Sequence, residues 1–88
     1  MNISVIVPAY NEAARIGSVL KAIDNAELVD QLLVVDDGST DDTCRKVRES
    51  PARTELISLS NNTGKANALA RGVEAASNPI LMFLDADL

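Results

Sequence analysis

The sequence predicts an α/β domain, a three-layer arrangement in which helices cover both faces of a parallel, Rossmann-like sheet. Short apolar runs typical of buried strands alternate with segments whose polar and apolar residues follow the period of a helix. Such regular alternation indicates parallel strands joined by right-handed crossovers. The 88 residues allow one domain at most.

The first strand and helix are predicted from the N-terminal stretch. Residues 3–7 form a β-branched run, and Pro8 is expected to end it. Asn11 is expected to cap the helix that follows. The apolar stripe of this helix has the i, i+3, i+4, i+7 spacing and consists of Ile16, Val19, Leu20 and Ile23.

The second strand is predicted at residues 32–35, and a helix should begin near Thr40. Ser39 and Asp42 have the spacing of a capping box, in which the side chains of two residues three apart satisfy the first backbone N–H groups of a helix. The Ser-Pro pair at residues 50–51 should end this helix.

The last predicted elements are a strand, a helix and a final strand. Residues 55–59 alternate only weakly, which indicates a strand at the edge of the sheet. The next helix has apolar residues at Ala66, Leu69, Ala70 and Val73 and stops at residues 77–79. Residues 80–84 are all large and apolar, so this strand is expected to be buried on both faces. The chain stops soon after it, so we expect an incomplete N-terminal portion of a larger sheet.

Polar residues follow the carboxyl end of each predicted strand, where open parallel sheets bind ligands. They are Tyr10, Asn11 and Glu12 after the first strand, Asp36, Asp37, Gly38 and Ser39 after the second, Asn61, Asn62, Gly64 and Lys65 after the third, and Asp85 and Asp87 after the fourth. Carboxylates this close repel one another unless a cation or a donor-rich ligand lies among them.

Asp85 and Asp87 are the strongest candidates for metal ligands. Side chains two residues apart in an extended segment point the same way, so these carboxylates should converge on one hard divalent cation, Mg²⁺ or Mn²⁺. The Asp-x-Asp spacing alone also fits a solvated turn, so the metal hypothesis depends on the residues at the other strand ends.

A nucleoside diphosphate satisfies these features together. Its base and ribose offer donors to the acids, and its diphosphate chelates a metal. Lys65 would approach a phosphate, because a surface role for a lysine at a helix start is disfavoured by the helix dipole. Tyr10 would stack on the base or pack on its own turn. Glu12 and Asp36 also fit simple turn or first-turn roles. The sequence contains neither a Gly-x-Gly-x-x-Gly motif nor a P-loop.

Composition excludes several classes of function. A net charge of −5 without a basic stretch argues against a nucleic-acid partner. The absence of histidine excludes His-based metal sites and Ser-His or Cys-His catalysis by this chain alone. The single cysteine, Cys44, excludes an internal disulfide and fits a reducing, cytoplasmic compartment.

Four stretches, in order and covering essentially the whole chain, resemble the N-terminal half of family 2 glycosyltransferases with the GT-A fold. They are Val-Ile-Val-Pro-Ala-Tyr-Asn-Glu at residues 5–12, Val-Val-Asp-Asp-Gly-Ser-Thr-Asp at 34–41, Asn-Thr-Gly-Lys-Ala at 62–66 and Phe-Leu-Asp-Ala-Asp at 83–87.

The resemblance implies that residues 1–88 are the nucleotide-diphospho-sugar-binding part of a metal-dependent glycosyltransferase that uses a UDP- or GDP-sugar. The implied pocket comprises Pro8, Ala9, Tyr10, Glu12 and Ala86 around the nucleotide, Asp37 as acceptor for the base, Lys65 near the phosphates, Asp85 towards the ribose and metal, and Asp87 as metal ligand. No residue matches the family's catalytic base.

The Asn-Thr-Gly-Lys-Ala and Asp-Ala-Asp-Leu pieces look closest to family members that act on polyprenyl phosphates or other phosphorylated acceptors. Membrane association of a full-length protein is therefore left open. The alternatives are a phosphotransferase of the haloacid-dehalogenase type, which places its acidic pair after the first strand, and a nucleotide-binding or receiver-like module without glycosyl transfer. An uncovered apolar fourth strand also predicts self-association of the isolated piece.

Overall fold

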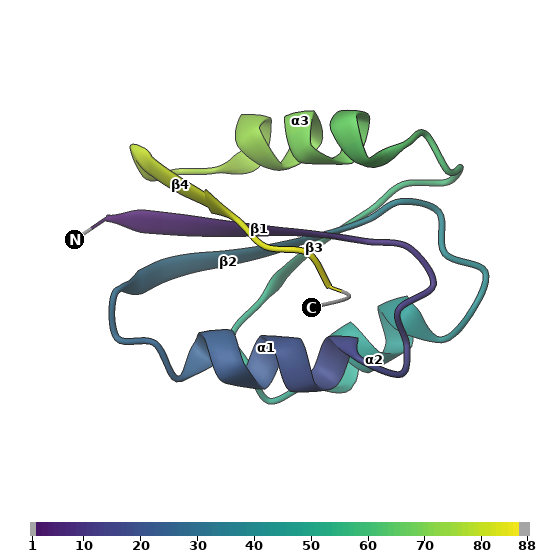
Figure 1. Ribbon diagram of the computed structural model, residues 1–88, viewed down its shortest axis with the longest axis horizontal. Coiled ribbons are helices and arrows are strands. Elements are labelled where there is room, and N and C mark those ends of the chain that lie inside the picture. The colour runs from purple at the N-terminus through teal and green to yellow at the C-terminus, as the bar shows by residue number, and fades with distance from the viewer. Residues whose placement is uncertain (1, 87–88) are drawn as a thin grey trace.

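The computed structural model describes residues 2–86 as a parallel β-sheet between two layers of helix (Figure 1). The elements follow in the order β1 (Ile3–Ala9), α1 (Ile16–Asp24), β2 (Val29–Asp36), α2 (Thr43–Glu49), β3 (Glu55–Ser58), α3 (Lys65–Ala75) and β4 (Ile80–Phe83). The predicted α/β class and the predicted order of elements are therefore confirmed.

The strand order β3-β2-β1-β4 determines where the layers lie. The chain moves outward from β1 through β2 to β3 and then returns across the sheet to β4, on the other side of β1. Because right-handed crossovers in opposite directions use opposite faces, α1 and α2 cover one face and α3 covers the other (Figure 1). The strand order reverses between β1 and β4, which is the position where such sheets bind ligands.

The two central strands carry the core. All of β1 is buried, as are the last five residues of β2. On one face these strands pack against α1 and α2 through Ile16, Leu20 and Val47, and on the other Ile6, Leu33 and Val35 pack against Ala68 of α3. No helix in the described part of the chain has the length and apolar character needed to span a membrane.

All four strands differ from the predicted bounds, β3 and β4 only in ending one residue earlier, at Ser58 and Phe83. β2 begins at Val29, ahead of the predicted start at residue 32. β1 continues through Pro8 to Ala9. It pairs with β4 only as far as Ile6, so Pro8 lies where β1 has a single partner strand and a missing N–H is tolerated.

The two predicted helix caps are wrong. Arg15 precedes α1 and its side chain makes no capping hydrogen bond, and the same holds for Asp42 before α2. Asn11 instead adopts a left-handed conformation with φ of 52° and accepts hydrogen bonds from the loop after β2. The Ser39 hydroxyl donates to Asp36 Oδ1 at 2.5 Å, which closes the turn rather than capping α2.

β4 is not buried on both faces, so that prediction is wrong for this piece, whereas the expectation that the fourth strand is uncovered in it is confirmed. Ile80, Met82 and Phe83 are 47%, 46% and 52% exposed. Among the described residues β4 pairs with β1 alone, at an edge of the sheet, and α3 packs mainly over β1 and β2. β3 lies at the opposite edge, as its weak alternation indicated.

Candidate functional site

A pocket of about 310 Å³ lies at the carboxyl ends of the strands, where the strand order reverses. Its lining comes from all four strand ends and from α3 and consists of Pro8, Ala9, Tyr10, Glu12, Asp37, Asn62, Gly64, Lys65, Ala68, Asp85 and Ala86. It lacks Asn11, Asp36, Gly38, Ser39 and Asn61, but contains every described residue of the pocket that the family resemblance implies. The remaining one, Asp87, lies outside the described residues. Stretches far apart in the sequence therefore meet at one place.

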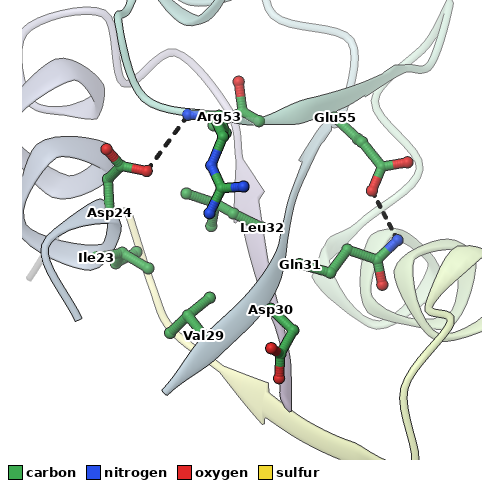
Figure 2. Close-up of a pocket in the computed structure, with 9 residues that line it drawn as sticks. Ile23, Asp24, Val29, Asp30, Gln31, Leu32, Arg53 and Glu55 are labelled. Atoms are coloured by element: carbon green, nitrogen blue, oxygen red, sulfur yellow. Dashed lines mark hydrogen bonds between the residues drawn. The ribbon is translucent and has the colours of Figure 1, made fainter. Parts of the chain in front are cut away.

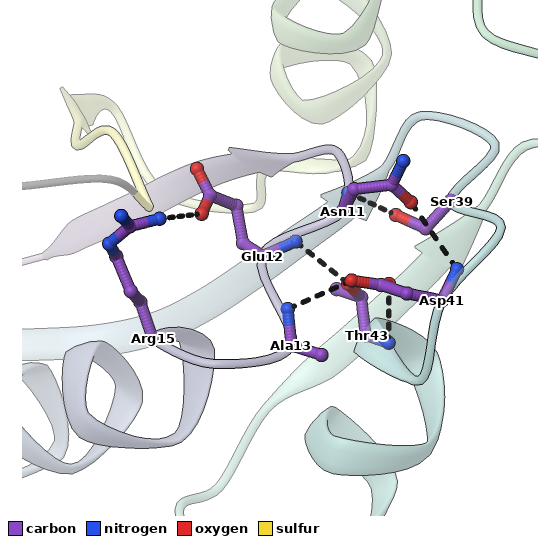
Figure 3. Close-up of polar contacts among 7 residues, drawn as sticks. All are labelled: Asn11, Glu12, Ala13, Arg15, Ser39, Asp41 and Thr43. Carbon is purple, nitrogen blue, oxygen red and sulfur yellow. Dashed lines mark hydrogen bonds and ion pairs between the residues drawn. The ribbon is translucent and has the colours of Figure 1, made fainter.

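β1 and its loop supply one wall of the pocket. Tyr10 is 45% exposed, so part of its ring is open to a ligand. Glu12 is held in place twice: its backbone N–H donates to Thr43 Oγ1 at 2.9 Å, and its carboxylate pairs with Arg15 at 2.8 Å (Figure 3). Because Arg15 already neutralises it, Glu12 adds less negative charge to the pocket than its sequence position indicated.

Polar contacts join the loop after β1 to the loop after β2 (Figure 3). The Asn11 N–H donates to Ser39 Oγ at 2.8 Å, and Asn11 Oδ1 accepts from the Thr40 N–H at 2.8 Å. The Ala13 N–H donates to Asp41 Oδ2 at 3.3 Å. The Thr43 hydroxyl lowers the pKa of Asp41 by donating to its carboxylate, against a smaller opposing effect of burial. These contacts fix the loop that carries Tyr10.

Asp37 forms the floor of the pocket between the loops after β2 and β3. Its N–H donates to the Ala9 carbonyl at 2.8 Å, which continues the β1–β2 ladder by one more bond. Its carboxylate is buried and accepts from the Thr63 N–H at 2.9 Å, the Thr63 hydroxyl at 2.8 Å and the Gly64 N–H at 2.8 Å. Burial raises the pKa of Asp37, but these three hydrogen bonds together outweigh burial and hold the pKa below its ordinary value.

Asp36 is separated from this pocket, although it neighbours Asp37 in the sequence. Its carboxylate is buried and accepts from the N–H and the hydroxyl of Ser39, at 3.1 Å and 2.5 Å. Of the two roles that the sequence left open for Asp36, the structure shows the turn role.

Lys65 and Asp85 both line the pocket and form an ion pair. Lys65 is the first residue of α3, and Asp85 follows β4. The pair therefore places a cation and a carboxylate, both partly exposed, between two segments of the lining. Such a pair can exchange partners when a phosphate and a metal ion enter together.

The donor set at this end of the pocket fits a hard divalent cation. The described residues contain no cluster of three or more His, Cys, Asp or Glu side chains that would hold a metal by themselves. Mg²⁺ commonly needs only one or two carboxylates, because waters and substrate phosphates complete its shell. The half-exposed carboxylate of Asp85 matches that requirement.

Sequence reasoning missed two residues of the site. Ala68 is buried in α3 and lines the pocket, but at the sequence level it is only one of several small residues in a helix. Thr63 binds Asp37 through its backbone and its side chain. Its signals were its position in the turn after the third strand and its place in the Asn-Thr-Gly-Lys-Ala stretch at residues 62–66.

A second pocket, of about 230 Å³, lies at the opposite end of the sheet, where β2 and β3 begin (Figure 2). Its polar groups bind one another: Gln31 donates to Glu55 at 2.6 Å, and the backbone N–H of Arg53 donates to Asp24 at 3.4 Å. It contains no predicted site residue.

The comparisons with known proteins show the family of the chain. The sequence profile of glycosyl transferase family 2 matches residues 4–88. The chain belongs to this family. It is 43% identical to glucosyl-3-phosphoglycerate synthase of Mycobacterium tuberculosis over 93 residues, which cover 98% of the chain and 29% of that protein. It is 36% identical to dolichol-phosphate mannosyltransferase of Pyrococcus furiosus over 92 residues, 100% of the chain and 26% of that protein.

Solved structures confirm the GT-A fold. The M. tuberculosis synthase in complex with Mn²⁺, UDP and glucosyl-3-phosphoglycerate matches with a TM-score of 0.83 and 39% identity, over 97% of this chain and 33% of that one. A mannosyltransferase from Pyrobaculum calidifontis in complex with GDP-Man and Mn²⁺ matches with a TM-score of 0.88 and 33% identity, over 98% of this chain and 27% of that one. The chain thus spans between a quarter and a third of these longer proteins and matches their N-terminal part. The family match does not favour the phosphotransferase and the non-catalytic alternatives.

Proposed function

We propose that residues 1–88 are the nucleotide-diphospho-sugar-binding part of a glycosyltransferase that transfers a sugar from a UDP- or GDP-sugar in a metal-dependent reaction. The main support is the pocket at the strand ends, which is lined by residues from all four strand ends. Two relatives whose structures match this chain closely were solved with Mn²⁺ and either UDP or GDP-Man.

The lining residues suggest how the donor lies in the pocket. The half-exposed Tyr10 offers a stacking surface for the base, and Asp37 lines the same pocket as an acceptor. Small side chains at Ala9, Ala68 and Ala86 leave room for the nucleotide. The ribose and diphosphate would then extend towards Lys65 and Asp85, at the end of the pocket that carries their ion pair.

Asp85 and Asp87 would hold Mg²⁺ or Mn²⁺ against the diphosphate. When bound, such an ion stabilises the negative charge of the leaving nucleoside diphosphate. Lys65 would leave Asp85 for a phosphate oxygen and so contribute a second positive charge to the same leaving group. We assign no residue of this chain as the catalytic base.

The acceptor is proposed by chemical class. The two named relatives are a phosphoglycerate glucosyltransferase and a dolichol-phosphate mannosyltransferase, so a phosphorylated acceptor is the class common to both. We propose a cytoplasmic location for the site, with membrane association if the acceptor is a polyprenyl phosphate.

Titration calorimetry tests the donor site. UDP, GDP and inorganic phosphate are titrated with and without Mn²⁺ into the wild-type chain and into Asp85→Asn, Asp87→Ala and Asp24→Asn. We expect Mn²⁺-dependent binding of a nucleoside diphosphate that both site variants weaken strongly. Asp24→Asn makes the same chemical change as Asp85→Asn in the second pocket, so it should bind like the wild type. Binding that ignores both the metal and the base would contradict the proposal.

A further inference from the structure

The carboxylate of Asp37 does more than line the pocket, because it binds a loop 26 residues away in the sequence. The segment at residues 59–64 connects β3 to α3 and has no regular structure. Near α3 this loop is exposed, yet the N–H groups of both Thr63 and Gly64 donate to one buried carboxylate. The Thr63 hydroxyl donates to it as well, and itself accepts from Asn67 Nδ2 at 2.8 Å.

Close backbone contact accompanies these hydrogen bonds. Gly38 adopts a φ of 76°, and a Cβ added there would lie 2.4 Å from the carbonyl carbon of Asn61 and 2.5 Å from the nitrogen of Asn62. The loop after β2 and loop 59–64 therefore touch backbone to backbone. This contact allows the short side chain of Asp37 to reach two successive N–H groups.

The loop leads directly into the phosphate end of the pocket. Gly64 immediately precedes Lys65, and its carbonyl accepts from the N–H of Ala68 at 3.1 Å in the first turn of α3. Lys65 in turn pairs with Asp85. A movement of loop 59–64 would therefore displace Lys65, Ala68 and the Lys65–Asp85 pair together.

We propose that Asp37 is a positioning residue, whose carboxylate holds loop 59–64 so that Lys65 and the first turn of α3 stay at the diphosphate end of the pocket. This inference rests on the proposed nucleotide site and adds to it. A carboxylate has about four acceptor positions. Three of them are occupied by Thr63 and Gly64, so one remains for a ligand.

Two probes separate positioning from direct contact with the base: UDP with Mn²⁺, and inorganic diphosphate with Mn²⁺, which has no base. Asp37→Asn replaces one acceptor oxygen by a donor, and Thr63→Val removes the hydroxyl bond from the loop side without changing Asp37. Asp24→Asn in the second pocket is the control. We expect both site variants to weaken the binding of both probes by about tenfold, equivalent to ~1.4 kcal/mol, and the control variant to bind them like the wild type.

A double-variant cycle tests whether the effect passes through the lysine. In a Lys65→Ala background, Asp37→Asn should weaken the binding of inorganic diphosphate by less than about twofold, because the lysine that Asp37 positions is already absent. If Asp37→Asn weakens UDP and leaves inorganic diphosphate unchanged, the carboxylate acts on the base and the inference is wrong.

Amide hydrogen exchange at Gly64 gives a readout that needs no ligand. Both Asp37→Asn and Thr63→Val should speed exchange of this amide relative to the wild type. If the wild-type chain binds neither probe, the proposed function fails. Exchange at Gly64 then decides the positioning role alone, and an unchanged rate would overturn it.

Discussion

Replacing Gly38 by alanine should separate the two loops that form the pocket floor. The φ of 76° at Gly38 is a left-handed conformation, which costs an alanine about 1–2 kcal/mol. The added Cβ would also lie 2.4 Å from the carbonyl carbon of Asn61, and that atom is backbone and cannot rotate away. Overpacking of this kind typically costs about 1–3 kcal/mol. We therefore expect Gly38→Ala to lower the free energy of unfolding by about 2–5 kcal/mol.

Urea unfolding followed by circular dichroism measures this loss. With a slope near 1 kcal/mol per molar urea, a loss of about 2 kcal/mol moves the midpoint down by roughly 2 M. Gly17→Ala is the matched control, because Gly17 lies in α1 with nothing within 4 Å of an added Cβ. It should stabilise the protein by about 0.4–1 kcal/mol. A loss below about 1 kcal/mol for Gly38→Ala would show that the two loops are not in close contact.

Three further predictions concern acid stability, the free edge and the thiol. Folding lowers the pKa of Asp37, so the stability that its carboxylate contributes is present above the ordinary pKa of 3.8 and is lost as the pH falls through the lower folded-state pKa. In urea titrations across that pH range, Asp37→Asn should therefore lose less stability on acidification than the wild type. Equal losses would contradict this. The exposed Met82 and Phe83 at the edge strand β4 should cause concentration-dependent self-association, measured by sedimentation velocity. The double variant Met82→Lys/Phe83→Lys should associate less. A monodisperse wild-type monomer would refute this prediction. Burial and the nearby Asp36 carboxylate raise the pKa of the Cys44 thiol, despite its hydrogen bond with Ser58. Iodoacetamide should therefore alkylate Cys44 more slowly than a free thiol at the same pH. An equal alkylation rate would argue against the raised pKa.

The elements and the grouping of the candidate residues around one pocket could be predicted from the sequence, because both follow from local patterns and topology. A polar residue after a buried parallel strand must lie at the carboxyl edge of the sheet, so Tyr10, Asp37, Lys65 and Asp85 had to lie along the same edge. The family resemblance added roles for these residues. It did not depend on knowing which side chains contact one another.

Two of the predictions that were wrong, those for Asn11 and β4, depended on contacts between distant residues. Asn11 has the composition of a helix cap, but its partners Ser39 and Thr40 lie in another loop, 28 and 29 residues away. Likewise, nothing in the composition of loop 59–64 indicated that Asp37 would bind it. The apolar run of β4 predicted burial, but burial depends on which element covers the strand, and α3 packs over β1 and β2 instead.

We expect the ligand to bind at the carboxyl ends of the strands, and the other predictions for the site depend on this. Chemical-shift mapping of the backbone amides during titration with UDP or GDP and Mg²⁺ tests this claim directly, since the two pockets lie at opposite ends of the sheet. We predict shifts at Tyr10, Gly64, Lys65 and Ala86, with little change at Asp24 and Arg53. Shifts confined to the second pocket, or no saturable shifts at all, would show that the nucleotide does not bind at the strand ends.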